Sequence, residues 1–166
     1  MTADKPIFLV GFMGSGKTTV GRALAHRLGL RFVDLDETVE ARAGKTIAEI
    51  FAEAGEAEFR RLEREALDLC RGVEAGVIAL GGGAYESEAN RAALRSMGRT
   101  VWLNCPLGIC ASRVSRDRRR PLVGDRAEMK ILLDRRRANY ALADHTVDVG
   151  SRTIREIVDE IVTLIR

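Results

Sequence analysis

The residues with the clearest chemistry lie in a glycine-rich segment near the N-terminus. The run from Gly11 to Thr18, Gly-Phe-Met-Gly-Ser-Gly-Lys-Thr, matches the phosphate-binding pattern G-x-x-x-x-G-K-[ST] at every fixed position. Glycines allow the backbone of such a loop to approach phosphates closely. In this pattern Lys17 neutralises the β- and γ-phosphates, and the Thr18 hydroxyl is a ligand of Mg²⁺. The segment therefore predicts polyphosphate binding; the weaker alternative is a glycine-rich turn followed by a chance Lys-Thr pair.

Two carboxylates follow the second apolar run of the chain, in Asp34-Leu35-Asp36. Because side chains alternate along a strand with a period of two, we expect both carboxylates on one side of the strand end. In open α/β sheets the ligand crevice lies at the carboxyl ends of the strands, where the glycine-rich loop also lies. One carboxylate would serve Mg²⁺ and the other an accepting hydroxyl. The alternative is that Asp36 only caps the following helix.

The third apolar run ends directly in Gly81-Gly82-Gly83. Three consecutive glycines offer backbone amides to a ligand with no side chains in the way. Taken alone, the run indicates a binding loop no more strongly than it indicates a plain flexible turn.

Two arginines on expected helices are candidates for holding an anionic ligand. Arg60 lies on a helix whose buried face we expect to be formed by Phe59, Leu62, Ala66 and Leu69, and Arg136 precedes Tyr140 by about one turn. A guanidinium can hold a carboxylate with two parallel hydrogen bonds. On spacing alone, each arginine is more readily a solvated helix charge or an i,i+3 partner of a glutamate.

The stretch from Arg113 to Arg126 is rich in arginine and poor in apolar side chains. We therefore expect a mobile surface segment that does not pack as a core element. Its Arg120-Pro121-Leu122 portion would deliver a cation over a γ-phosphate and exclude water on closing, as a lid does. The alternative is a basic loop for RNA or DNA, but no aromatic side chains interleave with these arginines.

Short runs rich in Val, Ile and Leu alternate with longer amphipathic stretches, which is typical of an α/β fold with a buried parallel sheet. We find no internal repeat and no low-complexity linker, and we predict a single domain over residues 1–166. The expected strands are Ile7 to Val10, Phe32 to Leu35, Val77 to Leu80, Thr100 to Leu103 and Thr146 to Val149. The expected helices are Lys17 to Leu28, Ala57 to Arg71, Ala89 to Met97, Met129 to Leu142 and Ile154 to Ile165, with a shorter pair near Glu37 to Arg42 and Ile47 to Ala54.

Composition limits the class of protein. The chain has 166 residues, 46% of them hydrophobic, and its 27 Lys and Arg nearly balance 24 Asp and Glu, so the net charge of +3 does not by itself suggest a nucleic-acid binder. The N-terminus lacks the layout of a signal peptide and no stretch approaches the roughly 20 apolar residues of a membrane span, so we expect a soluble, cytoplasmic protein. The cysteines, Cys70, Cys105 and Cys110, form no short-spaced pair and are expected to be buried thiols.

Five motifs in order resemble those of the shikimate kinases across almost the whole chain. They are Gly-Phe-Met-Gly-Ser-Gly-Lys-Thr-Thr-Val-Gly, Phe-Val-Asp-Leu-Asp, Glu-Phe-Arg-Arg-Leu-Glu, Leu-Gly-Gly-Gly and Arg-Arg-Pro-Leu. The resemblance implies a three-layer P-loop kinase fold with a five-stranded parallel sheet, a lid over about 113–126 and substrate-binding helices over about 37–62. It also implies a monomer that transfers the γ-phosphate of ATP to the 3-hydroxyl of shikimate, with Mg²⁺, in the pathway to chorismate and the aromatic amino acids.

The same resemblance assigns roles to individual residues. It implies that Lys17, Asp36 and Arg120 are catalytic, that Thr18 and, through water, Asp34 serve Mg²⁺, and that Asp36 meets the accepting hydroxyl. The residues that would hold ATP are Gly14, Ser15, Gly16, Lys17, Thr18 and Thr19, with Arg120 at the phosphates and Arg113 and Arg152 flanking adenine. The residues that would hold shikimate are Arg60 and Arg136 at its carboxylate, with Gly81, Gly82 and Gly83 beside them.

Three other classes of protein remain to be weighed. The nearest is another small-molecule kinase, but a gluconate kinase would carry a His-rich stretch where this chain has Asp36-Glu-Thr-Val-Glu40. A nucleotide-binding regulator would not need both Asp34 and Asp36. A basic RNA-binding module would not have a nearly balanced charge.

Overall fold

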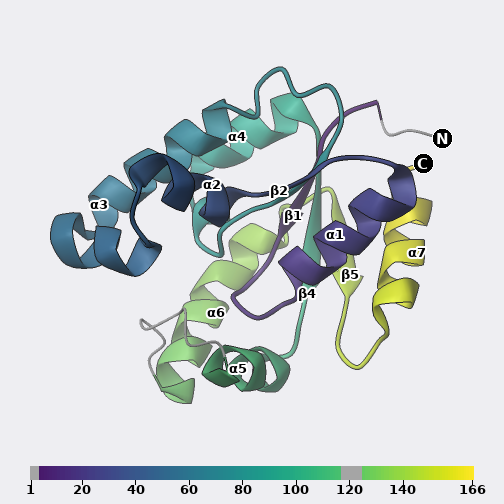
Figure 1. The fold of residues 1–166 in the computed structure, drawn as a ribbon. Helices are drawn as coiled ribbons and strands as arrows, with labels where there is room; N and C mark the ends of the chain where they lie inside the picture. The colour runs from purple at the N-terminus through teal and green to yellow at the C-terminus, as the bar shows by residue number, and fades with distance from the viewer. Residues whose placement is uncertain (1–3, 117–124) are drawn as a thin grey trace.

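The computed structural model describes residues 4–116 and 125–166 (Figure 1). The strands are β1 (Ile7–Val10), β2 (Phe32–Asp34), β3 (Val77–Ala79), β4 (Arg99–Asn104) and β5 (His145–Asp148). The helices are α1 (Lys17–Leu28), α2 (Leu35–Ala43), α3 (Ile47–Asp68), α4 (Glu88–Met97), α5 (Leu107–Arg116), α6 (Arg126–Tyr140) and α7 (Ile154–Leu164), with a 3-10 turn η1 (Ala84–Glu86).

The five strands form one parallel sheet in the order β2-β3-β1-β4-β5. Each of the five predicted strands is present, with its ends within one residue of the expected positions. Because the first strand lies in the middle, its carboxyl end is at the switch point of the sheet, where neighbouring connections leave in opposite directions and a ligand crevice opens. The predicted α/β class and five-stranded parallel sheet are confirmed.

Helices cover both faces of the sheet. In Figure 1, α1 and α7 lie together on one side, while α3, α4 and α6 lie on the other. Phe8 and Leu9 on β1 and Leu103 on β4 are fully buried, which explains why these central strands read as continuous apolar runs. All three cysteines are buried and free, as expected. Within residues 4–116 and 125–166, no helix is both long enough and apolar enough to cross a membrane.

The segment after β2 contains a break in a helix. Helix α3 begins at a capping box, in which Thr46 and Glu49 satisfy each other's backbone amides, and it is interrupted at Gly55, where φ is 81° and ψ is 177°. A side chain is disfavoured at this positive φ, so glycine sets the position of the break. The predicted short helix and long helix are therefore the two halves of α3.

The mobile segment predicted from Arg113 onward begins too early in the sequence. Arg113 to Arg116 belong to helix α5, which the sequence reading omitted, and Val114 in it is buried. The spacing of Leu107, Cys110 and Val114 is the helical signal that could have revealed α5. At the other end, Asp125 caps α6 through a hydrogen bond from the Glu128 amide. The remaining part of the expected lid, with Arg120, lies outside the described residues.

Candidate active site

The glycine-rich loop joins the carboxyl end of β1 to the first residue of α1. Gly16 caps α1 in the left-handed region with φ of 95°, and this N-cap residue makes no side-chain hydrogen bond to the amides of the first turn. At Gly14, φ is 76° and an added Cβ would lie 2.7 Å from the Cys110 carbonyl oxygen of α5, so only glycine fits there. The free amides and positive end of α1 make this loop a site for anions.

Lys17 is held over the loop. Its ammonium donates to the carbonyl oxygens of Gly11 at 2.7 Å and Phe12 at 3.0 Å, and the residue is only 8% exposed. Ser15, a residue of the loop itself, is 1% exposed. The loop thus carries a buried cation beside its backbone amides.

The two carboxylates after β2 have different local roles from those expected. The strand ends at Asp34, which caps α2 by accepting from the amides of Asp36 at 3.0 Å and Glu37 at 3.4 Å. Its other oxygen accepts from the Thr18 hydroxyl at 2.8 Å. The period-of-two argument was therefore wrong, because Asp36 lies in the first turn of a helix, and the cap considered for Asp36 is made by Asp34.

Charged side chains lie close to the backbone of the triple glycine after β3. A Cβ added to Gly81 would lie 2.7 Å from Asp36 Oδ1 and 2.9 Å from Glu63 Oε2, and one added to Gly83 would lie 2.3 Å from Arg60 Nη2. At Gly82 the nearest atom to such a Cβ is Arg136 Nη1, at 3.3 Å. Glycine is therefore favoured here because four charged side chains converge on the backbone, which is not expected of a plain flexible turn.

Each of the two arginines is held by a glutamate. Arg60 Nη1 is 2.9 Å from Glu63 Oε1, so its expected i,i+3 partner exists, yet the same side chain lines the cavity described below. Arg136 Nε donates to Glu86 Oε2 at 3.0 Å, and its side chain is 8% exposed. The expectation of solvated helix charges is thus wrong for Arg136.

Glu63 is a site residue that the sequence reading did not single out. It is 1% exposed, and within the described chain its Oε2 has no hydrogen-bond partner. Burial raises the pKa of this carboxyl, Arg60 and Arg136 oppose the rise, and the nearby Asp36 charge adds to it. The buried face of α3 contains Phe59, Glu63, Ala66 and Leu67, whereas Leu69, expected to be buried, is 54% exposed.

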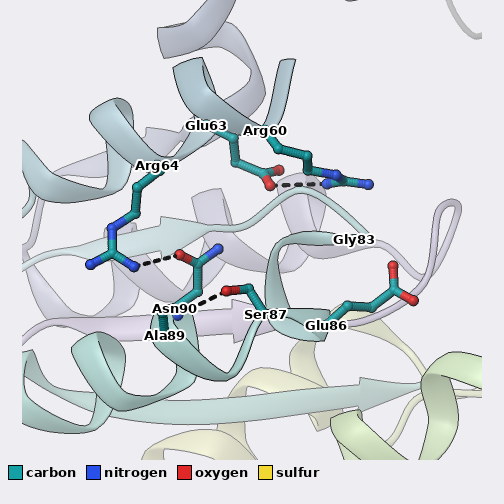
Figure 2. Close-up of a pocket in the computed structure, with 8 residues that line it drawn as sticks. All are labelled: Arg60, Glu63, Arg64, Gly83, Glu86, Ser87, Ala89 and Asn90. Atoms are coloured by element: carbon teal, nitrogen blue, oxygen red, sulfur yellow. Dashed lines mark hydrogen bonds and ion pairs between the residues drawn. The ribbon is translucent and has the colours of Figure 1, made fainter. Parts of the chain in front are cut away.

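A cavity of ≈ 780 Å³ joins the loop to the arginines. A second one of ≈ 600 Å³ lies beyond Arg60, Glu63 and Gly83, which line both (Figure 2). Of the predicted site residues, the larger cavity is lined by Gly14, Gly16, Lys17, Thr18, Thr19, Asp34, Asp36, Arg60, Gly81, Gly82, Gly83, Arg113 and Arg136. The same cavity is thus lined by a phosphate-type loop and by the guanidinium groups of Arg60 and Arg136.

Arg113 lines the cavity, whereas the predicted residues Ser15 and Arg152 are not among its described lining residues. Arg113 Nη1 donates to the Gly14 carbonyl oxygen at 3.1 Å, so it lies against the loop from α5. Arg152 pairs with Glu160 and donates to the Asp148 carbonyl oxygen, and it is not among the residues that line the cavity, although Ile154 is. Arg120 lies outside the described residues. The adenine-flanking roles of Arg113 and Arg152 stay predictions.

Comparison with known proteins decides the family. The family model described as "Shikimate kinase" matches residues 13–166. The chain belongs to the shikimate kinase family. It is therefore an ATP-dependent kinase, and the predicted family is confirmed.

Individual relatives cover nearly the whole chain. A shikimate kinase of Salinispora arenicola is 50% identical over 161 residues, which are 95% of this chain and 95% of the relative. One of Geobacter sulfurreducens is 43% identical over 163 residues, which are 96% of this chain and 90% of the relative. The match therefore extends beyond the phosphate loop to nearly the whole chain.

Solved structures agree with this family and its fold. A shikimate kinase from Acinetobacter baumannii in complex with shikimate has a TM-score of 0.91 at 37% identity and covers 97% of this chain and 92% of that one. A gluconokinase from Sinorhizobium meliloti has a TM-score of 0.62 at 17% identity over 99% of this chain and 93% of that one, so it shares the fold alone. The predicted P-loop kinase fold is confirmed.

Proposed function

We propose that this chain transfers the γ-phosphate of ATP to the 3-hydroxyl of shikimate, giving shikimate 3-phosphate and ADP in the pathway to chorismate and the aromatic amino acids. The observation that carries the proposal is one cavity with the phosphate-type loop at one end and Asp36, Arg60 and Arg136 at the other, in a chain of this family. An acceptor with both a hydroxyl and a carboxylate fits that second end.

The nucleotide end would bind and neutralise the triphosphate. The loop amides and the α1 N-terminus face the cavity, so they would hold the phosphates. Lys17 would exchange its bonds to the Gly11 and Phe12 carbonyl oxygens for phosphate oxygens. Charge spreads over the phosphate oxygens during transfer, and a preorganised cation stabilises that charge.

The acceptor end would orient the hydroxyl. Arg136 and Arg60, with the backbone of Gly82, would hold the carboxylate of shikimate and fix the ring relative to Asp36. A reactant held in line with the γ-phosphate reacts far faster than one that diffuses freely. Asp36 would accept a hydrogen bond from the 3-hydroxyl and take its proton late in the transfer.

The residues near the loop fit a magnesium ion. Thr18 Oγ1 lies 2.8 Å from Asp34 Oδ2, and hydroxyl and carboxylate oxygens are the ligand types that Mg²⁺ takes. Among the described residues there is no cluster of three or more metal-binding side chains, which suits an ion that keeps several waters and binds largely through substrate phosphates. When bound, Mg²⁺ would neutralise phosphate charge, with Thr18 as direct ligand and Asp34 acting through water.

Arginines of the lid would complete the site. Arg113 already lies against Gly14 from α5, and Arg120 is proposed to reach the phosphates when the segment between α5 and α6 closes. Closure would exclude water, which would otherwise compete with shikimate as the acceptor. The monomeric state and the cytoplasmic location also stay predictions.

The test is release of ADP from Mg-ATP, coupled to NADH oxidation, with shikimate, gluconate or AMP as the acceptor. Saturable release that depends on shikimate is the expected result. Release driven by gluconate or AMP would contradict the proposed acceptor and leave the kinase fold intact. Slow release that no acceptor stimulates would instead favour a regulatory nucleotide-binding protein.

A further inference from the structure

Glu86 is the last residue of η1, the turn that directly follows the triple glycine. In Figure 2 its side chain extends away from Arg64, Ser87 and Asn90, the polar group on the other side of the smaller cavity. Its carboxylate instead meets α6, where Oε2 accepts from Arg136 Nε at 3.0 Å and Oε1 from Arg135 Nε at 3.3 Å. Glu86 therefore links the glycine turn to the buried arginine of the acceptor end.

The backbone that carries Glu86 is fixed by α4. Asn90 Nδ2 donates to the Ala84 carbonyl oxygen at 2.9 Å, and Arg91 Nη1 donates to those of Tyr85 at 2.8 Å and Glu86 at 2.7 Å. All three carbonyl groups of η1 are thus held by side chains of one helix. The carboxylate of Glu86 consequently starts from a rigid base and is not on a freely moving loop.

The bond to Glu86 fixes the orientation of Arg136. It uses Nε, at the edge of the guanidinium nearest the side-chain stem, and among the described residues Glu86 is the one carboxylate that forms an ion pair with this group. Because a guanidinium is planar, a fixed Nε–H direction also fixes where the two Nη atoms point. Nη1 faces Gly82 and the larger cavity, in position for a carboxylate.

The other arginine is held in a different way. Arg60 Nη1 pairs with Glu63 at 2.9 Å and Nη2 lies 3.4 Å from Glu56, so both of its terminal nitrogens already face carboxylates. Arg136 is therefore the arginine whose terminal nitrogens are presented to a ligand, and Glu86 is the group that presents them.

We propose that Glu86 is a positioning residue for the acceptor, which aligns Arg136 to grip the carboxylate of shikimate. This inference rests on the proposed function. It assigns Glu86 no contact with the reacting atoms, because its partner atom is the one at the far side of the guanidinium from the ligand. Its effect is therefore expected in acceptor affinity and not in the transfer step.

Removing the negative charge of Glu86 has two opposing effects on binding of the acceptor carboxylate. The negative charge repels an acceptor carboxylate, so its loss alone would favour binding. That repulsion acts across the guanidinium and is weakened by solvent, since the Glu86 side chain is 26% exposed. Solvent cannot replace Glu86 in orienting Arg136, because only 8% of the Arg136 side chain is exposed. We expect the loss of alignment to outweigh the loss of repulsion.

The experiment measures saturation kinetics of Glu86→Gln with shikimate and with Mg-ATP. The shikimate KM is expected to rise about tenfold, while kcat and the ATP KM change by less than about threefold. Glu88→Gln is the matched control, because it removes the same charge two residues away from an exposed position and its kinetics should be those of the wild type. A change in the shikimate KM of Glu86→Gln below twofold, or a comparable change in the control, would overturn the inference.

A double variant separates alignment from general disturbance. In an Arg136→Met background, Glu86→Gln should raise the shikimate KM no further, because the group that Glu86 aligns is gone. An equal rise in both backgrounds would show that Glu86 acts by another route. A wild type that turned over ATP without responding to shikimate would contradict the proposed function. A shikimate-dependent wild type with an unaffected Glu86→Gln variant would contradict only the role of Glu86.

Discussion

The two ends of the larger cavity are built in opposite ways. The proposed nucleotide end comes from one continuous segment, Gly11 to Thr18, and would act mainly through backbone amides and Lys17. The proposed acceptor end is assembled from α2, α3, α6 and the triple glycine, and would act through charged side chains held by other charged side chains. A local segment can specify a site for phosphate, whereas a site for one particular acceptor needs contacts between distant segments.

This difference predicts how substitutions at the two ends will behave. Loss of the Lys17 ammonium at the nucleotide end should stop turnover whatever the acceptor. Changes among the charges at the acceptor end should separate into effects on the transfer step and effects on acceptor affinity. Four predictions, ordered by expected size, test this contrast.

Lys17→Ala should have the largest effect. It removes the buried cation that would meet the β- and γ-phosphates, and we expect kcat to fall by about 10³-fold. Coupled ADP release with saturating shikimate measures the loss. Lys45→Ala is the control, because Lys45 pairs with Glu53 at the surface and should keep wild-type activity. A Lys17→Ala variant that retained a tenth of the activity would contradict the proposed dependence of the nucleotide end on Lys17.

Asp36→Asn should reduce the transfer step at the acceptor end. The amide keeps the shape of the side chain but cannot take the hydroxyl proton, so we expect kcat to fall by about 10²-fold. The shikimate KM should change much less, because the arginines would still hold the carboxylate. Saturation kinetics with shikimate test this, and a raised KM with unchanged kcat would move Asp36 from chemistry to binding.

Arg136→Lys should mainly reduce acceptor affinity. Lysine keeps the charge but loses the planar fork and its Nε bond to Glu86, so we expect the shikimate KM to rise by about tenfold or more with a smaller change in kcat. The ATP KM serves as the internal control. Unchanged saturation by shikimate would remove Arg136 from the carboxylate site.

The smallest expected effect concerns Glu63 and pH. Because its pKa in the folded protein is raised above the ordinary value of 4.5, Glu63 favours the folded state at low pH, and this contribution is lost as pH rises through the folded pKa. Glu63→Gln should therefore become more stable relative to wild type between pH 5 and pH 7.5.

Urea unfolding of both proteins at the two pH values measures this difference. Glu65→Gln is the control, because Glu65 is exposed on the same helix and pairs with Arg61 at the surface. A relative stability of Glu63→Gln that fell with rising pH would mean that the attraction of Arg60 outweighs burial.

Much of the fold could be predicted because it depends on local pattern. Continuous apolar runs marked β1, β3 and β4, since a sheet covered on both faces buries nearly every side chain of its central strands. The fixed positions of the loop from Gly11 to Thr18 likewise reside in one segment. Helix α5 was missed because the arginines from Arg113 onward masked its short apolar stripe of Leu107, Cys110 and Val114.

The parts of the site that could not be predicted depend on distant contacts or on register. Glu86 and Arg136 are 50 residues apart, and no periodicity relates a 3-10 turn to a later helix. Glu63 was missed because the predicted buried face of α3 included Leu69. A face with that register does not contain Glu63. Asp34 and Asp36 were selected correctly as a pair, but for a strand geometry that the start of α2 does not allow.

The interruption at Gly55 divides α3 into halves with unequal anchorage. Before it, Ile50 is the only fully buried residue of the helix, whereas after it Phe59, Glu63, Ala66 and Leu67 all face the interior. A segment with few buried contacts opens at a lower free energy than a well-anchored neighbour, and a break in the backbone ladder lets it do so alone. Amide hydrogens of residues 50–54 should thus exchange with solvent well before those of residues 59–67, so that one wall of the acceptor cavity samples open forms while the arginine-bearing wall stays folded.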